Sequence, residues 1–304
     1  MKLVGLDIGG TKIEAKVLDS DGQELFVHRV ATPKNYPDFL DCVVDLITYV
    51  ESKVGNFARI GCGLPGAVSP VTGLMQNANS TFLIGQDVVG DLKQRLGKDV
   101  RIANDANCFA LSEAVDGAGA GSEIVFGVIL GTGCGGGVVI NQQVLTGANA
   151  ISGEWGHNPL PGFELEKDGE TGPCYCGRSH CIEQYLSGTG FAQQYNRKYG
   201  KDLKAQQIIE LAQQGDSQAK AAFDLYVDQL ARSLAAVTNI LDPHTIVFGG
   251  GFSNVDSLYP DVSEVIGKYI FAAEPRVQIR KAKYGDSSGV RGAAWLVRKQ
   301  NSKL

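Results

Sequence analysis

The sequence contains the same strand–glycine–strand pattern twice, and this repetition constrains the fold more than any other feature. Gly9-Gly10 interrupts the first copy, and Gly131-Thr132-Gly133 interrupts the second. The apolar runs that flank these two turns are 2–8, 13–18, 123–130 and 137–140. Short apolar runs bounded by glycine are typical of buried strands. We therefore expect two similar halves, each built on a sheet.

Other strand-like segments alternate with helical patterns, which favours an α/β fold. Apolar residues at helical spacing predict helices at 37–54, 106–115, 204–214, 217–240 and from about 289. Further strands are expected at 58–64, 98–103, 245–248 and 277–284. The glycine-rich stretch 116–122 is the best candidate for a hinge. The expected domains are a small one, 1–117 with 288–304, and a large one, 118–287, with a polar insertion at about 153–188.

Composition limits the classes of function. The chain has 304 residues, a formal net charge of -5 and an isoelectric point near 5.5, whereas a nucleic-acid-binding domain is usually basic. No apolar stretch approaches the length of about 18 residues that a membrane helix needs, and Asp7 breaks the run that a secretory signal would require. We expect a cytoplasmic enzyme without a nucleic-acid or membrane partner.

The first glycine turn has the residue types of a phosphate-binding loop. Phosphate oxygens are bound by converging backbone N–H groups, and glycine lets the backbone come close to a ligand. Thr11 adds a hydroxyl donor and Lys12 a cation, while Asp7 could hold Mg²⁺ directly or through water. The alternative is an ordinary hairpin, since Gly-Gly is a common turn.

The second glycine run favours the phosphate interpretation. Gly131-Thr132-Gly133-Cys134-Gly135-Gly136 matches the dinucleotide fingerprint G-x-G-x-x-G, but that fingerprint requires a helix directly after the glycines. Here Val138-Val139-Ile140 follows, which is typical of a strand. A second phosphate-binding hairpin explains the duplication better. Two such hairpins could bind the β- and γ-phosphates of ATP.

A polar pair, Asn104-Asp105, follows the strand expected at 98–103. Ligands of α/β sheets bind at the carboxyl ends of the strands. Phosphoryl transfer to a hydroxyl needs a base for the proton and a group that orients the nucleophile, and these roles suit Asp105 and Asn104. The alternative is that Asp105 only caps the following helix, and the residues alone leave both interpretations open.

Three of the seven cysteines, Cys174, Cys176 and Cys181, lie close together in the sequence. Without a secretory signal, such clustering indicates a metal site rather than disulfides. His157 would complete a closed tetrahedral Cys₃His zinc site, whose role is structural because no position remains for water. This zinc would stiffen the insertion at 153–188.

These motifs together resemble those of the ROK family of sugar kinases and transcriptional repressors, a branch of the actin-like superfamily. The resemblance covers essentially the whole chain. The segments that carry it are G-L-D-I-G-G-T-K at 5–12, G-L-P-G at 63–66, N-D-A-N at 104–107, G-T-G-C-G-G-G at 131–137, G-E-W-G-H at 153–157 and C-Y-C-G-R-S-H-C at 174–181. It implies an actin-like ATPase (ribonuclease H-like) fold, with two similar α/β domains around a central cleft.

The resemblance also implies roles for individual residues, with Asp105 as the catalytic base. Sugar contacts are expected from Asn79, Asn104, Asp105, Glu154, His157 and Glu183. Contacts with ATP are expected from Asp7, Gly9, Gly10, Thr11, Lys12, Gly131, Thr132, Gly133, Gly249, Gly250 and Gly251. The family usually has glycine where this chain has His180, which is either a bystander or a competing ligand for the fourth zinc position. The complete G-E-W-G-H match favours His157.

Enzymes and repressors of the family differ at the N-terminus. The repressors carry a helix-turn-helix domain before the first glycine turn, and Asp7 leaves no room for one here. A non-catalytic sugar sensor is the other alternative, but Asp105 and both glycine turns are intact. We expect a kinase that uses ATP and Mg²⁺, contains structural Zn²⁺ and forms a homodimer, as is usual in the family.

The sugar is predicted from local likeness. The segments 77–81, 153–161 and 281–289 resemble the bacterial fructokinases of the family most closely. The expected reaction therefore transfers phosphate from ATP to the 6-hydroxyl of D-fructose, with mannose or glucose as side substrates. The alternative is an N-acetyl-D-glucosamine kinase or glucokinase of the same family, the former with room for an acetamido group.

Overall fold

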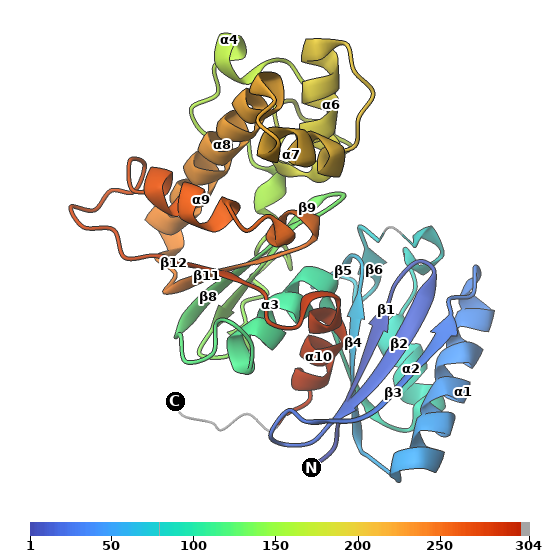
Figure 1. The fold of residues 1–304 in the computed structure, drawn as a ribbon. Helices are drawn as coiled ribbons and strands as arrows, with labels where there is room; N and C mark the ends of the chain where they lie inside the picture. The colour runs from blue at the N-terminus through green and yellow to red at the C-terminus, as the bar shows by residue number, and fades with distance from the viewer. Residues whose placement is uncertain (79, 299–304) are drawn as a thin grey trace. The chain divides into compact units, whose positions relative to one another are not determined.

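The computed structural model describes residues 1–78 and 80–298, which contain two five-stranded sheets (Figure 1). The first sheet has the order β3-β2-β1-β4-β7, and the second has the order β10-β9-β8-β11-β12. The strands of the first are β1 (Leu3–Ile8), β2 (Lys12–Leu18), β3 (Glu24–Ala31), β4 (Arg59–Leu64) and β7 (Asp99–Asn104). Those of the second are β8 (Ile124–Leu130), β9 (Cys134–Ile140), β10 (Gln143–Val144), β11 (Thr245–Gly249) and β12 (Gln278–Lys281).

The two sheets follow the same plan. In the first, β2 pairs antiparallel with β1 and β3, while β4 pairs parallel with β1 and β7. In the second, β9 pairs antiparallel with β10, while β11 pairs parallel with β8 and β12. Each sheet thus joins an antiparallel edge to a parallel one in the same strand order. The duplication predicted from the glycine turns is confirmed.

The described chain groups into two compact units. The first contains Met1–Gly121, Gly137–Ser152 and the chain from Lys283, and the second contains Ser122–Gly136 and Gly153–Ala282. The helices of the first unit are α1 (Tyr36–Val54), α2 (Val88–Leu96), α3 (Asp105–Val115) and α10 (Ser288–Trp295). Those of the second are α4 (Leu165–Asp168), α5 (Glu183–Leu186), α6 (Gly188–Tyr199), α7 (Ala205–Gln213), α8 (Ser217–Leu241) and α9 (Leu258–Ile266). A short ribbon, β5 (Ala67–Val68) with β6 (Met75–Gln76), completes the first unit.

Membership of the units differs from the expected domains at residues 118–121, 137–152 and 283–287. Residues 137–152, which were expected in the large domain, group with the first unit. One reason is that Gly137 lies against α3, where a Cβ atom would come 2.6 Å from Ala106 O. The expected boundaries of independently folding domains stay a prediction.

The first unit is held together by apolar packing and by close backbone contact. Helix α1 begins at Asn35, whose side chain accepts a hydrogen bond from Asp38 N, and its apolar face is buried. The core residues of α1 are Phe39, Leu40, Val43, Leu46, Ile47 and Val50. Helix α10 touches the strands directly, since a Cβ atom at Gly61 of β4 would overlap Ala293 O. Glycine therefore lets the last described helix lie on the sheet.

The second unit packs around the long helix α8. Asp216 caps this helix by accepting from Ala219 N, and its apolar stripe is buried as the sequence predicts. A buried ion pair links α8 to the insertion, because Arg232 Nη2 lies 2.6 Å from Asp168 Oδ1. Gln229 donates a second hydrogen bond to the same carboxylate at 3.1 Å. The insertion is thus fixed to the core by buried polar contacts, which are stronger in the interior than in water.

Two predicted strands have different bounds. The strand expected at 137–140 begins earlier, at Cys134, so β9 contains the glycines that were placed in the turn. The strand expected at 277–284 is shorter and ends at Lys281. Its continuation is prevented because Lys283 N and Tyr284 N donate to the buried Glu113 carboxylate, at 3.0 and 3.3 Å, instead of to a neighbouring strand.

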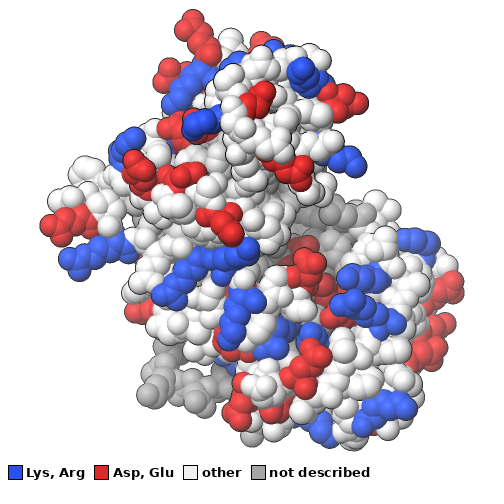
Figure 2. Space-filling view, viewed as in Figure 1, with Lys and Arg blue, Asp and Glu red and all other residues white. Residues whose placement is uncertain are grey.

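The surface carries both signs of charge. Figure 2 shows acidic and basic side chains intermixed over the visible face. Such a pattern differs from the basic stripe of a nucleic-acid-binding surface. Within residues 1–78 and 80–298, no helix is both long enough and apolar enough to cross a lipid bilayer.

Candidate active site

The first glycine turn joins β1 to β2, and its carbonyl groups are bound by side chains and backbone of the first unit. Gly9 O accepts from Thr32 Oγ1 at 2.7 Å, Gly10 O accepts from Lys34 Nζ at 2.6 Å, and Thr11 O accepts from Thr32 N at 3.0 Å. In a trans peptide the N–H points away from the preceding carbonyl. The N–H groups of Gly10 and Thr11 therefore point away from the carbonyl partners, as an anion site requires.

Asp7 lies at the end of β1, directly before this turn. Its carboxylate is closely surrounded, since a Cβ atom at Gly289 would lie 3.2 Å from Asp7 Oδ2. Burial, followed by the negative charges of Asp105 and Glu14, raises the pKa of Asp7 to about 6, against the opposing effect of Lys12. A divalent cation at this carboxylate would remove the repulsion.

The sequence left open whether Asp105 is a helix cap or a base, and the structure gives a capping role to Asn104. Asn104 is the N-cap of α3, with Oδ1 accepting from Ala106 N at 2.8 Å, so helix capping does not depend on Asp105 alone. Asp105 Oδ1 accepts from the same N–H at 2.8 Å. Asp105 is accessible to solvent yet closely surrounded by protein, and this desolvation raises the pKa of its carboxyl. An accessible carboxylate with a raised pKa suits a general base.

The second glycine turn repeats the arrangement of the first. Gly131 O accepts from Gly188 N at 2.7 Å, Thr132 O accepts from Thr189 Oγ1 at 3.0 Å, and Gly133 O accepts from Gly131 N at 3.0 Å. The N–H groups of Thr132 and Gly133 are therefore directed away from these partners. In both turns the carbonyl groups are hydrogen-bonded within the protein, while two backbone N–H groups point away from these partners.

The partners of the carbonyl groups are residues that sequence reasoning missed. Thr32 and Lys34 follow β3, while Gly188 and Thr189 begin α6. The latter pair lies in a Ser-Gly-Thr-Gly segment whose Ser187 caps α6, and this capping pattern was the available signal. Nothing in the sequence around Thr32 or Lys34 pointed to the turn.

Glu183 joins the second turn to the residues predicted to bind sugar. Its Oε2 accepts from Cys134 N at 3.0 Å. Trp155 Nε1 donates to Gly135 O at 3.0 Å, and a Cβ atom at Gly156 would overlap Cys134 O. The G-E-W-G-H segment, the Glu183 carboxylate and the start of β9 therefore form one packed cluster within the second unit.

The third glycine run lies against the second turn. Gly250 has φ 78°, a left-handed conformation that favours glycine. A Cβ atom there would come 2.6 Å from Leu130 O and 2.9 Å from Gly131 N. Gly249 and Gly251 flank this contact, so the run expected on the adenosine side lies beside the second glycine turn.

Four potential metal ligands come together in the insertion. The ligand atoms of His157, Cys174, Cys176 and Cys181 all lie within 4.8 Å of one another. His157 Nδ1 is 3.6 Å from Cys174 Sγ, and Cys176 Sγ is 3.6 Å from Cys181 Sγ. A zinc tetrahedron with Zn–S of about 2.3 Å and Zn–N of about 2.0–2.1 Å has edges of about 3.5–3.8 Å. The donor set fits zinc in type and in spacing.

The thiols of this cluster also favour a bound cation. Burial raises the pKa of Cys181 to about 12, while the backbone N–H of Arg178 lowers the pKa of Cys176. Adjacent thiols cannot all ionise without a compensating positive charge, and Zn²⁺ supplies that charge by replacing the protons.

His180 is engaged elsewhere. Its Nδ1 lies 3.0 Å from Tyr185 Oη, and its ring stacks on Phe163 with centroids 4.1 Å apart. Among the described residues, the metal cluster contains His157 and leaves His180 outside.

Tyr175 lies inside the same loop and was not predicted as a site residue. Its Oη is 2.7 Å from His157 Nε2, and the two rings meet edge to face with centroids 4.9 Å apart. Burial of the hydroxyl and the nearby carboxylates of Glu183 and Glu154 raise the pKa of Tyr175 to about 12. The hydroxyl therefore lies near the three residues of this unit that were expected to bind sugar.

The predicted site residues thus form one group in each unit. The first group contains the turn at 9–12 with Asp7, Asn104 and Asp105. The second contains the turn at 131–133, the run at 249–251, the metal cluster, Glu154 and Glu183. Asn79, also expected to contact sugar, lies outside the described residues.

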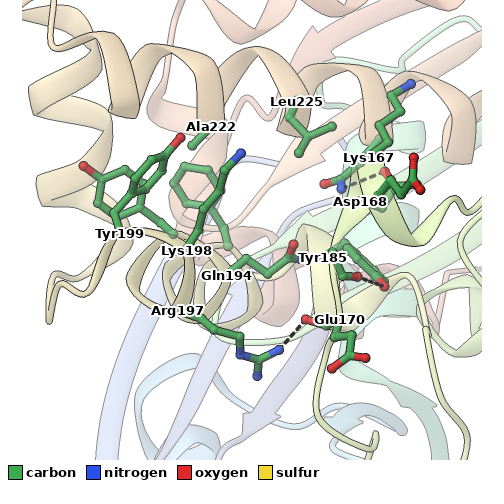
Figure 3. Close-up of a pocket in the computed structure, with 15 residues that line it drawn as sticks. Lys167, Asp168, Glu170, Tyr185, Gln194, Arg197, Lys198, Tyr199, Ala222 and Leu225 are labelled. Atoms are coloured by element: carbon green, nitrogen blue, oxygen red, sulfur yellow. Dashed lines mark hydrogen bonds between the residues drawn. The ribbon is translucent and has the colours of Figure 1, made fainter.

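A separate cavity of about 260 Å³ lies in the second unit, lined by α6, α8 and residues near 166–170 (Figure 3). None of the predicted site residues lines it. Its polar side chains are partly bound already: Gln229 donates to Asp168, and Tyr185 Oη donates to Gly169 O at 3.3 Å. The described lining residues contain no buried polar side-chain atom without a partner. The cavity therefore gives no indication of a ligand.

Comparison with known proteins gives a consistent result over the whole chain. A sequence model of the ROK family matches residues 3–300. An N-acetyl-D-glucosamine kinase of Escherichia coli O139:H28 is 42% identical over 296 residues, covering 96% of this chain and 98% of that protein. The ROK hexokinase of Thermus thermophilus is similar in structure, with a TM-score of 0.85, 29% identity and 97% of each chain covered. A ROK family glucokinase from Streptomyces griseus, solved with glucose and AMPPNP, has a TM-score of 0.76 and 27% identity, covering 97% of this chain and 99% of that chain.

The raised pKa of Asp7 predicts that replacing this residue stabilises the protein at high pH. A carboxyl whose pKa rises from 3.8 to about 6 on folding contributes stability that is complete below pH 3.8 and is lost as the pH rises through 6. At pH 8 without Mg²⁺, Asp7→Asn should therefore raise the free energy of unfolding by on the order of 1–3 kcal/mol. Urea unfolding should show this gain shrinking below pH 6 and vanishing near pH 4. The exposed Asp202→Asn variant is the control, and the same pH dependence in both variants would contradict the role of Asp7.

Loss of a single thiol should release the metal. Cys176→Ala leaves three ligands, so bound zinc should fall from about one per chain to near zero, with a melting temperature lower by several degrees. Elemental analysis and thermal unfolding measure the two effects. Cys42→Ala, a cysteine of α1 outside the cluster, should leave both unchanged. Absence of zinc from the freshly purified wild-type protein would refute the site.

Proposed function

The chain belongs to the ROK family and is an ATP-dependent sugar kinase with the actin-like ATPase fold, and we propose that its substrate is N-acetyl-D-glucosamine. The observation that carries this choice of sugar is the 42% identity with an N-acetyl-D-glucosamine kinase across 96% of the chain. The proposed product carries the phosphate on the 6-hydroxyl.

This proposal replaces the fructose predicted from the sequence. That prediction rested on the short segments 77–81, 153–161 and 281–289, whereas the comparison with the N-acetyl-D-glucosamine kinase uses nearly the whole chain. The middle segment also contains the zinc ligand and the packing glycines of the G-E-W-G-H cluster. Metal-ligand spacing and close packing restrict this segment whatever the sugar, so likeness there is weak support for any one sugar.

In the proposed mechanism Asp105 accepts the proton of the 6-hydroxyl as the oxygen attacks the γ-phosphorus and ADP leaves. Its raised pKa and its accessibility support this role. Asn104 fixes the geometry of the base, because its side chain holds the first turn of α3 through Ala106 N and also donates to Gly66 O at 3.3 Å. A base set on a helix terminus and anchored from two sides keeps its position during the reaction.

The two glycine turns are the proposed ATP-phosphate contacts. Their amides point away from the carbonyl partners in both units, an arrangement that stabilises negative charge. Lys12 adds a positive charge beside the first turn, and Asp7 is the residue that would hold Mg²⁺. When bound, Mg²⁺ neutralises charge on the phosphates.

The zinc-bearing insertion is the proposed sugar-binding part. Glu154, His157 and Glu183 offer acceptors and a donor for sugar hydroxyls, and the four-ligand cluster would hold their loop rigid. Since zinc would use only Nδ1 of His157, the other nitrogen remains for the sugar. The hydrogen bond from Cys134 N to Glu183 would let sugar binding affect the position of the second phosphate turn.

Assembly and location remain proposals as well. A homodimer is supported by an exposed apolar pair in the second unit, Ile240 and Phe271, which are 90% and 99% exposed. Asn239 joins them, since its Oδ1 accepts from Phe271 N at 2.9 Å. A monomeric mass in light scattering would contradict the dimer. The cytoplasmic location expected from the sequence stays a prediction.

Removal of the proposed base should affect catalysis and little else. Asp105→Asn should lower kcat by about 10²–10⁴-fold, because general-base catalysis contributes in that range. The melting temperature should change little, because Asn104 still caps α3. Asp99→Asn, at the opposite end of β7, is the matched control and should keep its kcat within about twofold. Activity that survives largely intact in Asp105→Asn would leave Asp105 as a structural residue only.

A screen of sugars tests the proposed substrate. Coupled measurement of ADP release should give kcat/KM for N-acetyl-D-glucosamine at least about 10²-fold above that for fructose, since a site that hydrogen-bonds the acetamido group loses those bonds with other sugars. Glucose and mannose serve as comparison sugars of the same ring size. A higher kcat/KM for fructose would restore the prediction made from the sequence.

A further inference from the structure

Tyr175 combines strong exposure with a specific hydrogen bond. The residue is 81% exposed, between two zinc-ligand cysteines, and yet its hydroxyl lies 2.7 Å from His157 Nε2. The edge-to-face contact of the two rings supports the same side-chain position. The hydroxyl of an exposed tyrosine can bind water equally well. Its hydrogen bond to His157, a proposed sugar contact, therefore requires an explanation.

His157 has only one N–H group available outside the metal side of its ring, so Tyr175 and a sugar would compete for it. Its Nδ1 faces Cys174 Sγ at 3.6 Å, which is the metal side of the ring. An imidazole that binds metal through one nitrogen carries its proton on the other. Nε2–H therefore donates, and the Tyr175 oxygen accepts. One N–H makes one strong hydrogen bond, so a sugar oxygen and the Tyr175 oxygen cannot both take it.

We propose that the Tyr175 hydroxyl occupies the place of a sugar oxygen in the free enzyme, and that sugar binding displaces it. The proposal rests on the proposed function, in which His157 binds the sugar. Tyr175 would then set the affinity for sugar by competing for His157, without touching the bound substrate.

The loop can permit this exchange without moving its backbone. Cys174 N donates to Arg178 O at 2.9 Å, and Arg178 Nη1 donates to His157 O at 3.2 Å. The backbone on both sides of Tyr175 is also tied to the metal cluster. The exposed side chain can rotate into solvent, so displacement costs one hydrogen bond and a ring contact.

The size of the effect follows from this cost. A protein whose binding-competent form is only partly populated shows an affinity reduced by that fraction. An ordinary net hydrogen bond corresponds to about a 2- to 12-fold change in an equilibrium constant. Tyr175 should therefore weaken sugar binding by a factor in this range.

The test compares wild-type protein with Tyr175→Phe, which keeps the ring and removes the hydroxyl. Calorimetric titration with N-acetyl-D-glucosamine should give a Kd about 2- to 12-fold lower for the variant, with KM lowered to match and the effect absent from kcat. Zinc content should be equal in the two proteins. Tyr49→Phe, an exposed tyrosine of α1, is the control and should bind as the wild type does.

The outcomes separate this proposal from the proposed function. Equal Kd values for wild type and Tyr175→Phe would overturn the role of Tyr175 alone. A higher Kd for the variant would also overturn it, because it would mean that the hydroxyl contacts the bound sugar. Titrations with glucose and fructose accompany the experiment, and failure of both proteins to bind any of the three sugars would overturn both proposals.

Discussion

Close contact between backbones, possible only at glycine, is the constraint on which both units depend. In the first unit, Cβ atoms at Gly5, Gly61 or Gly292 would overlap backbone atoms across the packed interface of α10 with β1, β4 and α3. In the second, Gly156 lies directly on Cys134, which fixes the G-E-W-G-H segment to the start of β9. A methyl group at any of these positions would separate elements that the site needs in contact. At these four positions glycine serves packing.

The two glycine turns share one arrangement of their backbone groups. Side chains and backbone from distant segments bind the carbonyl groups, and the amides are left for a ligand. In the first unit, the proposed phosphate contacts lie next to two carboxylates of raised pKa. The negative charge of Asp105 raises the pKa of Asp7, and in the proposed mechanism Mg²⁺ and the proton of the sugar hydroxyl would relieve this repulsion. Local instability of this kind is expected where binding must occur.

The sequence allowed much of the fold to be predicted, because local patterns determine local structure. Apolar runs located β1, β2, β4, β7, β8 and β11, and helical spacing located α1 and α8. The clustering of the four potential metal ligands could be predicted because chemistry and spacing both restrict them. Contacts between distant segments could not be predicted: Lys34 and Gly10 meet only after β3 has paired with β2, and Glu183 reaches Cys134 only after the insertion folds back. β3 itself escaped notice because its exposed side chains alternate with half-buried ones. The prediction of fructose rested on short segments, whereas the comparison over nearly the whole chain supports the proposed N-acetyl-D-glucosamine.

The contact between α10 and the first sheet has a consequence for synthesis of the protein. The core strands β1 and β4 leave the ribosome early, but the helix that covers them follows the whole second unit in the chain. Until α10 emerges, the glycine-lined face of these strands stays open to other surfaces. The second unit is drawn mainly from the continuous stretch Gly153–Ala282 and can gather its core sooner. The nascent chain therefore carries an unfinished first unit for most of translation, the interval in which chaperones have the most to protect.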